Sequence, residues 1–385
     1  MASRHIALFI KRLSMGGIQK IVVRLCNEFS KRGHKVDLLL AKGKGELVQE
    51  VHGGVRIIDF DKVRIKGTLP DLLKYLVKEK PDVLFSAEAP INLVALWAKM
   101  FLMGRPRVVV SIRSNMSGYA DANEVWYGPY TPALISLFYP FADSIIAISK
   151  GVLEDLSQIS ASAARKGCVV YNPTVTEELL HLAGETVHHP WFQPEAPPVI
   201  LGVGRLVGQK NFTLLLQAFA LVRKTQHVRL MILGDGKERE ELEHLAQMLG
   251  ISEDVCLPGF VDNPYKYMSR APLFVLSSNF EGFGNVVVEA LACGCPVVST
   301  NCPSGPAEIL QDGRWGRLVP VNDADALADA MREALAEEHD PNRLRERAMD
   351  FTVEKAVEAY LDVLLGACRT FPLVFAIFAG KITIA

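Results

Sequence analysis

The stretch of residues 279–301, NFEGFGNVVVEALACGCPVVSTN, decides how the rest of the chain is interpreted. It follows a short apolar run at 273–278 that predicts a buried strand, and it opens a helix at about 285–293 that a glycine and a proline end. Its glycines let the backbone turn sharply and leave free N–H groups at the helix start, where the dipole favours an anion. The stretch therefore predicts an α/β fold with a ligand site at the end of the strand.

Two acids in this stretch suggest what the ligand is. Glu281 stands in the loop before the helix, and Glu289 stands on its second turn. A rise of about 1.5 Å per residue separates the two carboxylates along the axis by something like the length of a sugar. A carboxylate accepts hydrogen bonds from two neighbouring hydroxyls, so the spacing suits one acid on a hexose and the other on a ribose. A glycine-rich turn with two surface acids is the alternative, and this stretch alone leaves it open.

Composition sets the frame for the whole chain. A length of 385 residues favours two domains of roughly 150 to 200 residues. Hydrophobic and charged contents of 49% and 22% are those of a globular protein with a sizeable core. The first half is slightly basic, which suits an acidic acceptor or an anionic membrane surface but is also unremarkable.

The cysteine pattern and the chain start indicate a compartment. The 7 cysteines are scattered, and Cys293 and Cys295 lack the spacing of a zinc site, which favours buried free thiols in a reducing cytosol. We see no signal-peptide pattern and no apolar run of membrane-spanning length. We therefore expect a cytoplasmic protein, with peripheral association to the inner face of a membrane as an open option.

Short apolar runs alternate with amphipathic helical stretches along both halves, which predicts doubly wound parallel sheets. The predicted strands of the first half are His5–Ile10, Lys35–Ala41, Val55–Phe60, Asp82–Ser86, Arg107–Ile112, Ser144–Ser149 and Cys168–Tyr171. Those of the second half are Val199–Val203, Arg229–Leu233, Val255–Leu257, Leu273–Leu276, Pro296–Thr300 and Arg317–Val319. The predicted fold is two tandem Rossmann-like domains that face a central cleft, where ligands of such sheets bind.

The predicted boundaries follow from where this alternation stops. We expect a first domain at 1–173, a proline-rich linker at 174–198 and a second domain at 199–350. A helical segment at 351–371 follows, and packing against the first domain is one option for it. The helical pattern itself runs from Asn342 to about Leu365. The last segment, 372–385, is apolar, and the sequence leaves its role open.

Three more glycine-rich turns point to the same cleft. Residues 14–19 follow the first strand and contain Gly16 and Gly17, which allow close approach of a phosphate or a sugar. Residues 202–211 follow the first strand of the second domain and carry Arg205 and Lys210, cations suited to a diphosphate. Residues 301–310 again join a strand to a helix start. Each turn alone is also compatible with an ordinary surface loop.

Together, in this order, these motifs resemble the GT-B retaining glycosyltransferases of family 4, over nearly the whole chain to about Arg369. The resemblance is carried by Gly16-Gly17, Gly204-Arg205 with Lys210, Gly234-Asp235-Gly236, the Glu281 and Glu289 pair, and Ser304-Gly305-Pro306-Ala307-Glu308. It implies that Arg205 and Lys210 hold the donor diphosphate, that Glu281 contacts the donor sugar, and that Glu289 binds the ribose diol. It further implies donor contacts from Gly16, Gly17, Gly204, Gly259, Phe260, Val261, Phe283, Gly284 and Asn285, with Arg205, Lys210 and Glu281 as the catalytic set.

The chain departs from this family pattern at one place. Many members carry a histidine after the strand that is predicted here at 107–112, where it meets the transferred sugar. This chain has Arg113, Ser114 and Asn115 there. We expect Arg113 or Asn115 to contact the sugar or the acceptor, and an ordinary loop is the alternative.

The resemblance implies transfer of a hexose or N-acetylhexosamine from a nucleotide sugar, UDP- rather than GDP-linked, to a saccharide or lipid-linked saccharide acceptor. It implies an α-glycosidic product in glycan biosynthesis, with no metal, no cofactor beyond the donor substrate and no nucleic-acid partner. The alternatives are a nucleotide-sugar epimerase on the same fold, a glycoside hydrolase using Glu281 and Glu289, and a non-catalytic nucleotide-sugar-binding protein. The sequence does not name the donor, the acceptor, the linkage or the oligomeric state.

Overall fold

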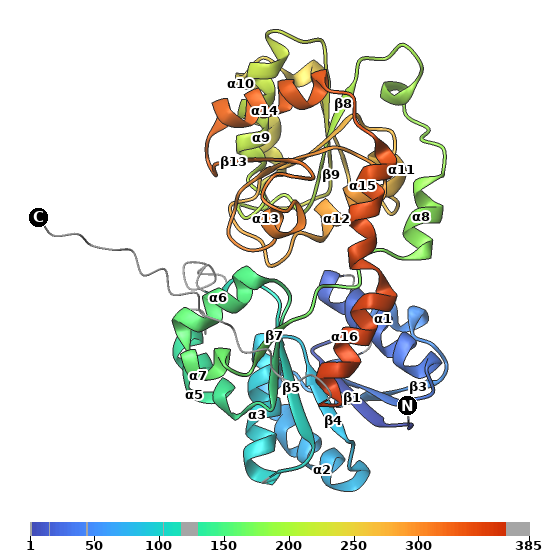
Figure 1. The fold of residues 1–385 in the computed structure, drawn as a ribbon, viewed down its shortest axis with the longest axis vertical. Helices are drawn as coiled ribbons and strands as arrows, with labels where there is room; N and C mark the ends of the chain where they lie inside the picture. The colour runs from blue at the N-terminus through green and yellow to red at the C-terminus, as the bar shows by residue number, and fades with distance from the viewer. Residues whose placement is uncertain (1, 15, 44, 103, 117–129, 367–385) are drawn as a thin grey trace, which may run out of the picture.

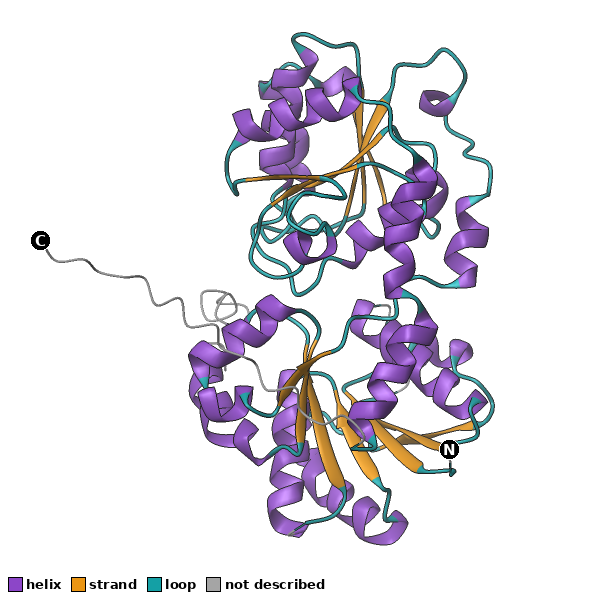
Figure 2. Cartoon of the chain, viewed as in Figure 1, coloured by secondary structure: helices purple, strands orange, loops and turns teal. Residues whose placement is uncertain are grey.

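The computed structural model describes residues 2–14, 16–43, 45–102, 104–116 and 130–366. The chain forms two lobes, each built on one parallel sheet with helices on both faces (Figure 1, Figure 2). This confirms the predicted α/β fold of two tandem Rossmann-like domains. The apolar tail at 372–385, Cys368 and the end of the segment at 351–371 lie outside the described residues.

The N-terminal lobe is the part built on the first sheet, which has seven strands in the order β3-β2-β1-β4-β5-β6-β7. Its strands are β1 (His5–Ile10), β2 (Lys35–Leu40), β3 (Val55–Asp59), β4 (Val83–Ser86), β5 (Arg107–Ile112), β6 (Ser144–Ala147) and β7 (Gly167–Val169). Its α-helices are α1 (Gly17–Lys31), α2 (Leu69–Glu79), α3 (Ala89–Leu102), α5 (Thr131–Phe138), α6 (Lys150–Ile159) and α7 (Ala161–Ala164). Short 3-10 helices are η1 (Glu46–Glu50), η2 (Ile65–Thr68) and η4 (Tyr139–Phe141).

The C-terminal lobe has six strands in the order β10-β9-β8-β11-β12-β13. Its strands are β8 (Val199–Val203), β9 (Arg229–Leu233), β10 (Val255–Gly259), β11 (Leu273–Leu276), β12 (Val297–Thr300) and β13 (Arg317–Val319). Its helices are α9 (Phe212–Arg223), α10 (Arg239–Met248), η6 (Ser252–Asp254), α11 (Tyr265–Met268), α12 (Asn285–Ala292), α13 (Pro306–Ile309), α14 (Ala324–Ala336), α15 (Pro341–Ala348) and η7 (Met349–Phe351). Every strand predicted from the sequence is present, with ends that differ by one or two residues.

The strands are apolar on both sides because both faces of each sheet are covered. In the N-terminal lobe, Phe9 belongs to the core shared with α2 and α3, whereas Leu8 faces the core shared with α1 and α16 (Val353–Leu364). Each fully buried side chain of this kind contributes about 1.5–3 kcal/mol relative to exposure. Figure 1 shows α16 lying beside α1 on the N-terminal lobe, although it is the last described helix of the chain.

The segment 174–198, predicted as a linker, contains two short helices that the sequence did not indicate. These are α8 (Glu177–Ala183) and η5 (Pro190–Phe192). The side-chain oxygen of Thr176 accepts a hydrogen bond from the Leu179 N–H at the start of α8, and Leu179 is buried. A short capped helix of this kind shows no periodicity long enough to be detected in the sequence.

The predicted helical stretch from Asn342 to about Leu365 is wrong as one continuous helix. The chain leaves α15, passes through η7 and starts α16 after Thr352, which has extended backbone and caps the new helix by accepting from the Lys355 N–H. At this break the chain crosses between the lobes, and the N–H groups of Thr174 and Val175 both donate to the carbonyl oxygen of Phe351. The two crossings of the chain therefore lie side by side and hydrogen-bond to each other.

Candidate functional site

Each sheet reverses its strand order at one point, and the glycine-rich turns lie at these two points. In the C-terminal lobe the reversal lies where β8 has β9 on one side and β11 on the other, and in the N-terminal lobe where β1 has β2 on one side and β4 on the other. Such a switch point leaves a crevice outside the carboxyl ends of the strands. Residues 204–211 follow β8, and residues 277–284 follow β11. The loops that carry Arg205, Lys210 and Glu281 therefore all begin at the C-terminal switch point.

Lys210 and Glu281 form an ion pair at this point. The Lys210 Nζ lies 2.6 Å from Glu281 Oε1, and the hydroxyl of Ser278 donates to the same oxygen at 2.7 Å. The side chains of the pair are 16% and 8% exposed, so water screens the interaction little. Removing one partner of such a pair leaves the other charge buried and uncompensated. The structure thus brings together two of the residues predicted to be catalytic.

The two loops that carry this pair are bonded to each other. The Gln209 side chain donates to the carbonyl oxygen of Phe280 at 3.0 Å, and the Asn279 N–H donates to the carbonyl oxygen of Gln209 at 2.9 Å. Asn211, which has a φ of 46°, caps α9 through its side chain. These bonds fix the backbone on both sides of Lys210, which limits the positions that the ammonium can take.

Arg205 lies on the same loop but is placed differently. Its side chain is exposed, and it makes no hydrogen bond or ion pair with the residues that the structure describes. Gly204, the residue before it, packs against the stem of Lys210, since a Cβ at Gly204 would lie 3.2 Å from Lys210 Cε. The Lys210 ammonium is therefore held inside the switch point, whereas Arg205 is exposed to solvent.

Glu289 lies on α12, and its side chain is partly buried. Burial raises the pKa of this carboxyl above its ordinary value, while Arg24 and Lys20 of α1 and Lys210 act in the opposite direction. The carboxyl therefore lies close to cations of both lobes. The helix begins after Gly284, whose φ of 90° is the left-handed conformation that favours glycine.

Two residues predicted to bind the donor use their side chains elsewhere. Phe283 is 2% exposed and stacks on Tyr171, with ring centroids 5.4 Å apart. The side-chain oxygen of Asn285 accepts from Asn172 at 2.8 Å. Both contacts join the lobes, so any contact of Phe283 with a ligand would have to come from its backbone.

The remaining predicted donor residues lie at other strand ends. Gly259, Phe260 and Val261 are at the end of β10, an edge strand, and the Phe260 ring is 68% exposed. Gly16 and Gly17 follow β1 and begin α1, where no side chain caps the helix. Both groups are at the carboxyl ends of their sheets. The first offers an aromatic face to a ligand, and the second offers free helix amides.

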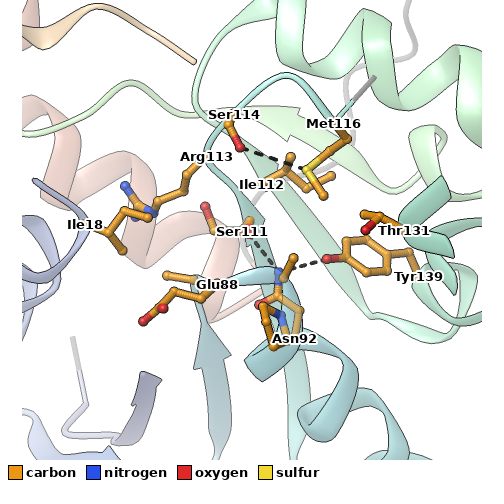
Figure 3. Close-up of a pocket in the computed structure, with 13 residues that line it drawn as sticks. Ile18, Glu88, Asn92, Ser111, Ile112, Arg113, Ser114, Met116, Thr131 and Tyr139 are labelled. Atoms are coloured by element: carbon orange, nitrogen blue, oxygen red, sulfur yellow. Dashed lines mark hydrogen bonds between the residues drawn. The ribbon is translucent and has the colours of Figure 1, made fainter. Parts of the chain in front are cut away.

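A pocket of about 180 Å³ lies at the switch point of the N-terminal lobe, and Figure 3 shows it. We call it the N-lobe pocket. It is lined by Ile18, Ala87, Glu88, Ala89, Pro90, Asn92, Ser111, Ile112, Arg113, Ser114, Met116, Thr131 and Tyr139. Its residues come from the ends of β4 and β5 and the helices beside them, so all belong to the first half of the chain.

Arg113 is held between three parts of the chain. Its Nη1 donates to Asn172 Oδ1 at 2.9 Å, and its Nη2 donates to the hydroxyl of Tyr360 on α16 at 3.0 Å. Its carbonyl oxygen lies against Gly282 of the other lobe, where a Cβ would come within 2.1 Å of it. Arg113 therefore joins the N-lobe pocket to the loop that carries Glu281. Asn115 follows it but is not among the residues that line the pocket.

Sequence reasoning missed Glu308 as a contact between the lobes. Its carboxylate accepts from the Tyr171 hydroxyl at 2.6 Å and from the Lys150 N–H at 2.9 Å. Burial raises its pKa, and these two hydrogen bonds oppose that shift. Residues 301–310 were predicted only to join a strand to a helix start, and nothing in the sequence indicates the partners of Glu308 on the other lobe.

The chain matches two known family descriptions. Residues 15–178 match glycosyltransferase family 4, and residues 185–351 match the glycosyl transferases group 1. One relative is N-acetylgalactosamine-N,N'-diacetylbacillosaminyl-diphospho-undecaprenol 4-alpha-N-acetylgalactosaminyltransferase of Campylobacter jejuni. The two sequences are 36% identical over 279 residues, which cover 71% of this chain and 74% of the relative. The chain is 30% identical over 362 residues, 91% of this chain and 96% of the relative, to the lipopolysaccharide core biosynthesis glycosyltransferase LpsE of Rhizobium meliloti.

Solved structures match the fold of both lobes together. The Anabaena protein Alr3699/HepE in complex with UDP aligns with a TM-score of 0.74 at 18% identity, covering 94% of this chain and 100% of that one. Sucrose-phosphate synthase from Thermosynechococcus elongatus aligns with a TM-score of 0.75 at 22% identity, covering 94% of this chain and 99% of that one. At these identities the likeness extends to the fold alone.

Proposed function

This chain belongs to glycosyltransferase family 4 with a GT-B fold, and we propose that it moves a hexose or N-acetylhexosamine from a UDP-sugar to a lipid-linked saccharide with retention of configuration. The observation that carries the proposal is the buried contact between Lys210 and Glu281 at the C-terminal switch point. It supports the proposal because a cation suited to a leaving diphosphate lies beside an acid suited to a hydroxyl of the donor sugar. Glycosyltransferase activity itself follows from the family.

The donor end of the proposal rests on five side chains. Lys210 and Arg205 would hold the diphosphate, Glu281 a hydroxyl of the donor sugar, and Glu289 the ribose diol. Phe260 would lie beside the base, because its exposed ring offers a stacking face. UDP is favoured over GDP because a structural neighbour was solved in complex with UDP.

The proposed chemistry is stabilisation of the leaving group. Negative charge grows on the diphosphate as the glycosidic bond breaks, and a preorganised ammonium in a water-poor site stabilises it strongly. Lys210 is held by Glu281 and by the bonded loops around it, so little reorganisation is needed at the moment of reaction. The acceptor hydroxyl would attack from the face that the diphosphate leaves and give its proton to a phosphate oxygen, which yields an α product from an α donor. The step requires no metal.

The acceptor end is proposed from the relatives and the N-lobe pocket. The Campylobacter relative is named for a diphospho-undecaprenol-linked saccharide, and the Rhizobium relative for lipopolysaccharide core biosynthesis. The N-lobe pocket adjoins the Glu281 loop through the contact of Arg113 with Gly282. A lipid-linked saccharide could thus place its sugar end in the pocket while its lipid stays outside.

A surface groove supports peripheral membrane contact. Most of α3 is buried, but its end joins an apolar groove lined by Leu69, Trp97, Met100, Phe101 and Phe138. Phe101 and Met100 are 68% and 45% exposed, and the exposed basic residues Arg64, Lys66 and Arg105 flank the groove in sequence. An apolar surface with basic edges is suited to an anionic bilayer. No helix in the described part of the chain has the length and apolarity needed to cross a membrane.

The central experiment incubates the protein with UDP- and GDP-sugars, with and without a lipid-linked saccharide acceptor. We expect UDP release that depends on the acceptor, and a product with an α linkage by NMR. Consumption of donor without acceptor, yielding an epimeric sugar, would indicate the epimerase alternative. An inverted, β-linked product would contradict the retaining mechanism.

Membrane contact is tested separately by co-sedimentation with vesicles of anionic phospholipid. We expect binding that weakens in Phe101→Ser and falls with added salt. Met248→Ser, which alters a methionine that is 74% exposed on the C-terminal lobe, is the matched control. Equal binding by both variants and the wild type would contradict a role for the groove.

A further inference from the structure

The start of α6, on the N-terminal lobe, is bonded to the loop that carries Glu281. Ser149 is 0% exposed, and its hydroxyl donates to the carbonyl oxygen of Gly282 at 2.8 Å. The next residue also reaches the C-terminal lobe, because the Lys150 N–H donates to the Glu308 carboxylate at 2.9 Å. One lobe therefore holds the backbone of the other directly after a residue of the proposed catalytic set.

The Ser149 hydroxyl makes two bonds that serve different purposes. Its oxygen accepts from the Val152 N–H at 3.2 Å and so caps α6. Its hydrogen goes to Gly282, and a hydroxyl can donate and accept at the same time. A cap requires only an acceptor, so the donated bond is not explained by the needs of the helix.

The donated bond fixes the peptide group that joins Gly282 to Phe283. This peptide group is trans, so its C=O and N–H point in opposite directions. With the carbonyl held by Ser149, the Phe283 N–H points away from α6. Phe283 is 2% exposed, yet its N–H donates to no group in the described part of the chain. Buried N–H groups rarely lack a partner, so this one indicates an acceptor that binds there.

The surroundings of the Phe283 N–H favour an anion. Phe283 precedes α12, whose N-terminus favours negative charge, and the Gly284 N–H also donates to none of the residues described. The Glu281 carboxylate would repel an anion, but the Lys210 ammonium bonded to it offsets that charge. A phosphate oxygen accepts hydrogen bonds strongly from such N–H groups. The diphosphate of the proposed donor has this chemistry.

We propose that Ser149 is a positioning residue of the donor site, which holds the Gly282 carbonyl from the other lobe and so directs the Phe283 N–H at the donor diphosphate. The inference rests on the proposed function, which supplies the diphosphate, and it adds a residue that touches no substrate. Asn285, at the end of the same loop, is also bonded to the chain before the crossing, through Asn172. The donor site is therefore complete only when both lobes are assembled.

The test compares the binding of UDP with that of uridine, which lacks the diphosphate. In Ser149→Ala and Ser149→Gly we expect the Kd of UDP to rise about tenfold, the size of one lost hydrogen bond. The Kd of uridine should stay within about twofold of its value in the wild type. Titrations followed by NMR measure both constants.

Ser160→Ala is the matched control for the loss of a helix cap. Ser160 is 6% exposed and caps α7, and its hydroxyl contacts Ser162 of the same lobe. We expect Ser160→Ala to lower the Tm without weakening UDP. Because glycine replaces a capping serine at little cost, Ser149→Gly should lower the Tm less than Ser149→Ala but weaken UDP equally. An unchanged Kd for UDP in both Ser149 variants, or an equal loss for uridine or in Ser160→Ala, would overturn the proposal.

A measurement without ligand separates this proposal from the proposed function. In hydrogen-exchange mass spectrometry of the free protein, residues 280–286 should exchange faster in both Ser149 variants than in the wild type and in Ser160→Ala. Equal exchange in all four proteins would refute the positioning role. A wild type that meets both expectations but transfers no sugar from any nucleotide sugar would refute the proposed function alone.

Discussion

The two lobes have the same switch-point topology but differ in what they place there. At the C-terminal switch point the polar groups satisfy each other, because Lys210 Nζ contacts Glu281 Oε1 and that oxygen also accepts from Ser278. At the N-terminal switch point two polar groups, on Ser111 and Arg113, have no partner in the described structure. The first arrangement fixes charges before a ligand arrives, and the second leaves hydrogen bonds to be completed by one. The two lobes thus differ in whether the polar groups at their switch points already have partners within the chain.

Removing the charge at the C-terminal switch point should have the largest effect. We expect Lys210→Met to lower kcat by about 10²–10³-fold, the cost of losing one preorganised donor to a developing negative charge. Methionine keeps the aliphatic stem but leaves the Glu281 charge uncompensated, so we expect a folded protein with a lower Tm. UDP release measures the loss, and thermal unfolding checks the fold. Lys224→Met, at the other end of α9, is the matched control, and comparable losses in the two variants would contradict the assignment.

The contact where the two ends meet should come next. In Gly282→Ala the added Cβ would lie 2.1 Å from the Arg113 carbonyl oxygen, so the lobes must shift apart. A displacement of about 1 Å at a reacting centre can cost up to about a hundredfold in rate, and we expect kcat/KM to fall tenfold or more. Steady-state kinetics measures it. Gly53→Ala is the control, because a Cβ there would meet nothing within 4 Å.

A smaller, pH-dependent effect is expected at Glu289. Because burial raises its pKa above the ordinary 4.5, the carboxyl keeps its proton as pH rises past that value and can then accept less well from the ribose. The donor KM should therefore fall as pH is raised from about 4.5 toward neutrality. In Glu289→Gln the KM at neutral pH should rise about tenfold, as expected for a hydrogen bond to a charged group, and this pH dependence should disappear. A pH profile that is the same in both proteins would exclude Glu289 as its source.

Removing divalent metals should have the smallest effect. Since the leaving group would be held by Lys210 and Arg205, we expect EDTA to leave the initial rate within about twofold of the untreated rate. Assays in EDTA with and without added Mg²⁺ measure this. A rate that collapses in EDTA and recovers with Mg²⁺ would show that these cations do not suffice.

The sequence predicted the framework well because the framework depends on local patterns. Every strand could be predicted from an apolar run in the sequence, because parallel strands are buried on both faces. The glycine-rich turns placed Lys210 and Glu281 at adjacent strand ends, and the structure brings them together. The strand order of a doubly wound sheet determines which strand ends are neighbours at the switch point. Residues that the sequence assigns to those strand ends therefore lie near each other.

What the sequence did not predict depends on contacts between distant parts. The break at Thr352 arises where the chain crosses between lobes, and its partner Val175 lies far away in the sequence. Glu308 meets Tyr171 only once the lobes are assembled. Whether the hydroxyl of Ser111 is paired cannot be read from residue type, because Ser86 has the same side chain and the same burial but a different neighbour.

The position of α16 has a consequence for how the chain is made. Its buried residues Val357, Tyr360, Leu361 and Leu364 complete a face of the first sheet, yet they are synthesised after the entire C-terminal lobe. The amino-terminal lobe emerging from a ribosome therefore carries an uncovered apolar side until α16 is made. A fragment ending at residue 173 should aggregate unless a peptide of residues 353–364 is supplied to it. For the same reason, a stop codon before residue 353 would damage the half of the protein that is synthesised first.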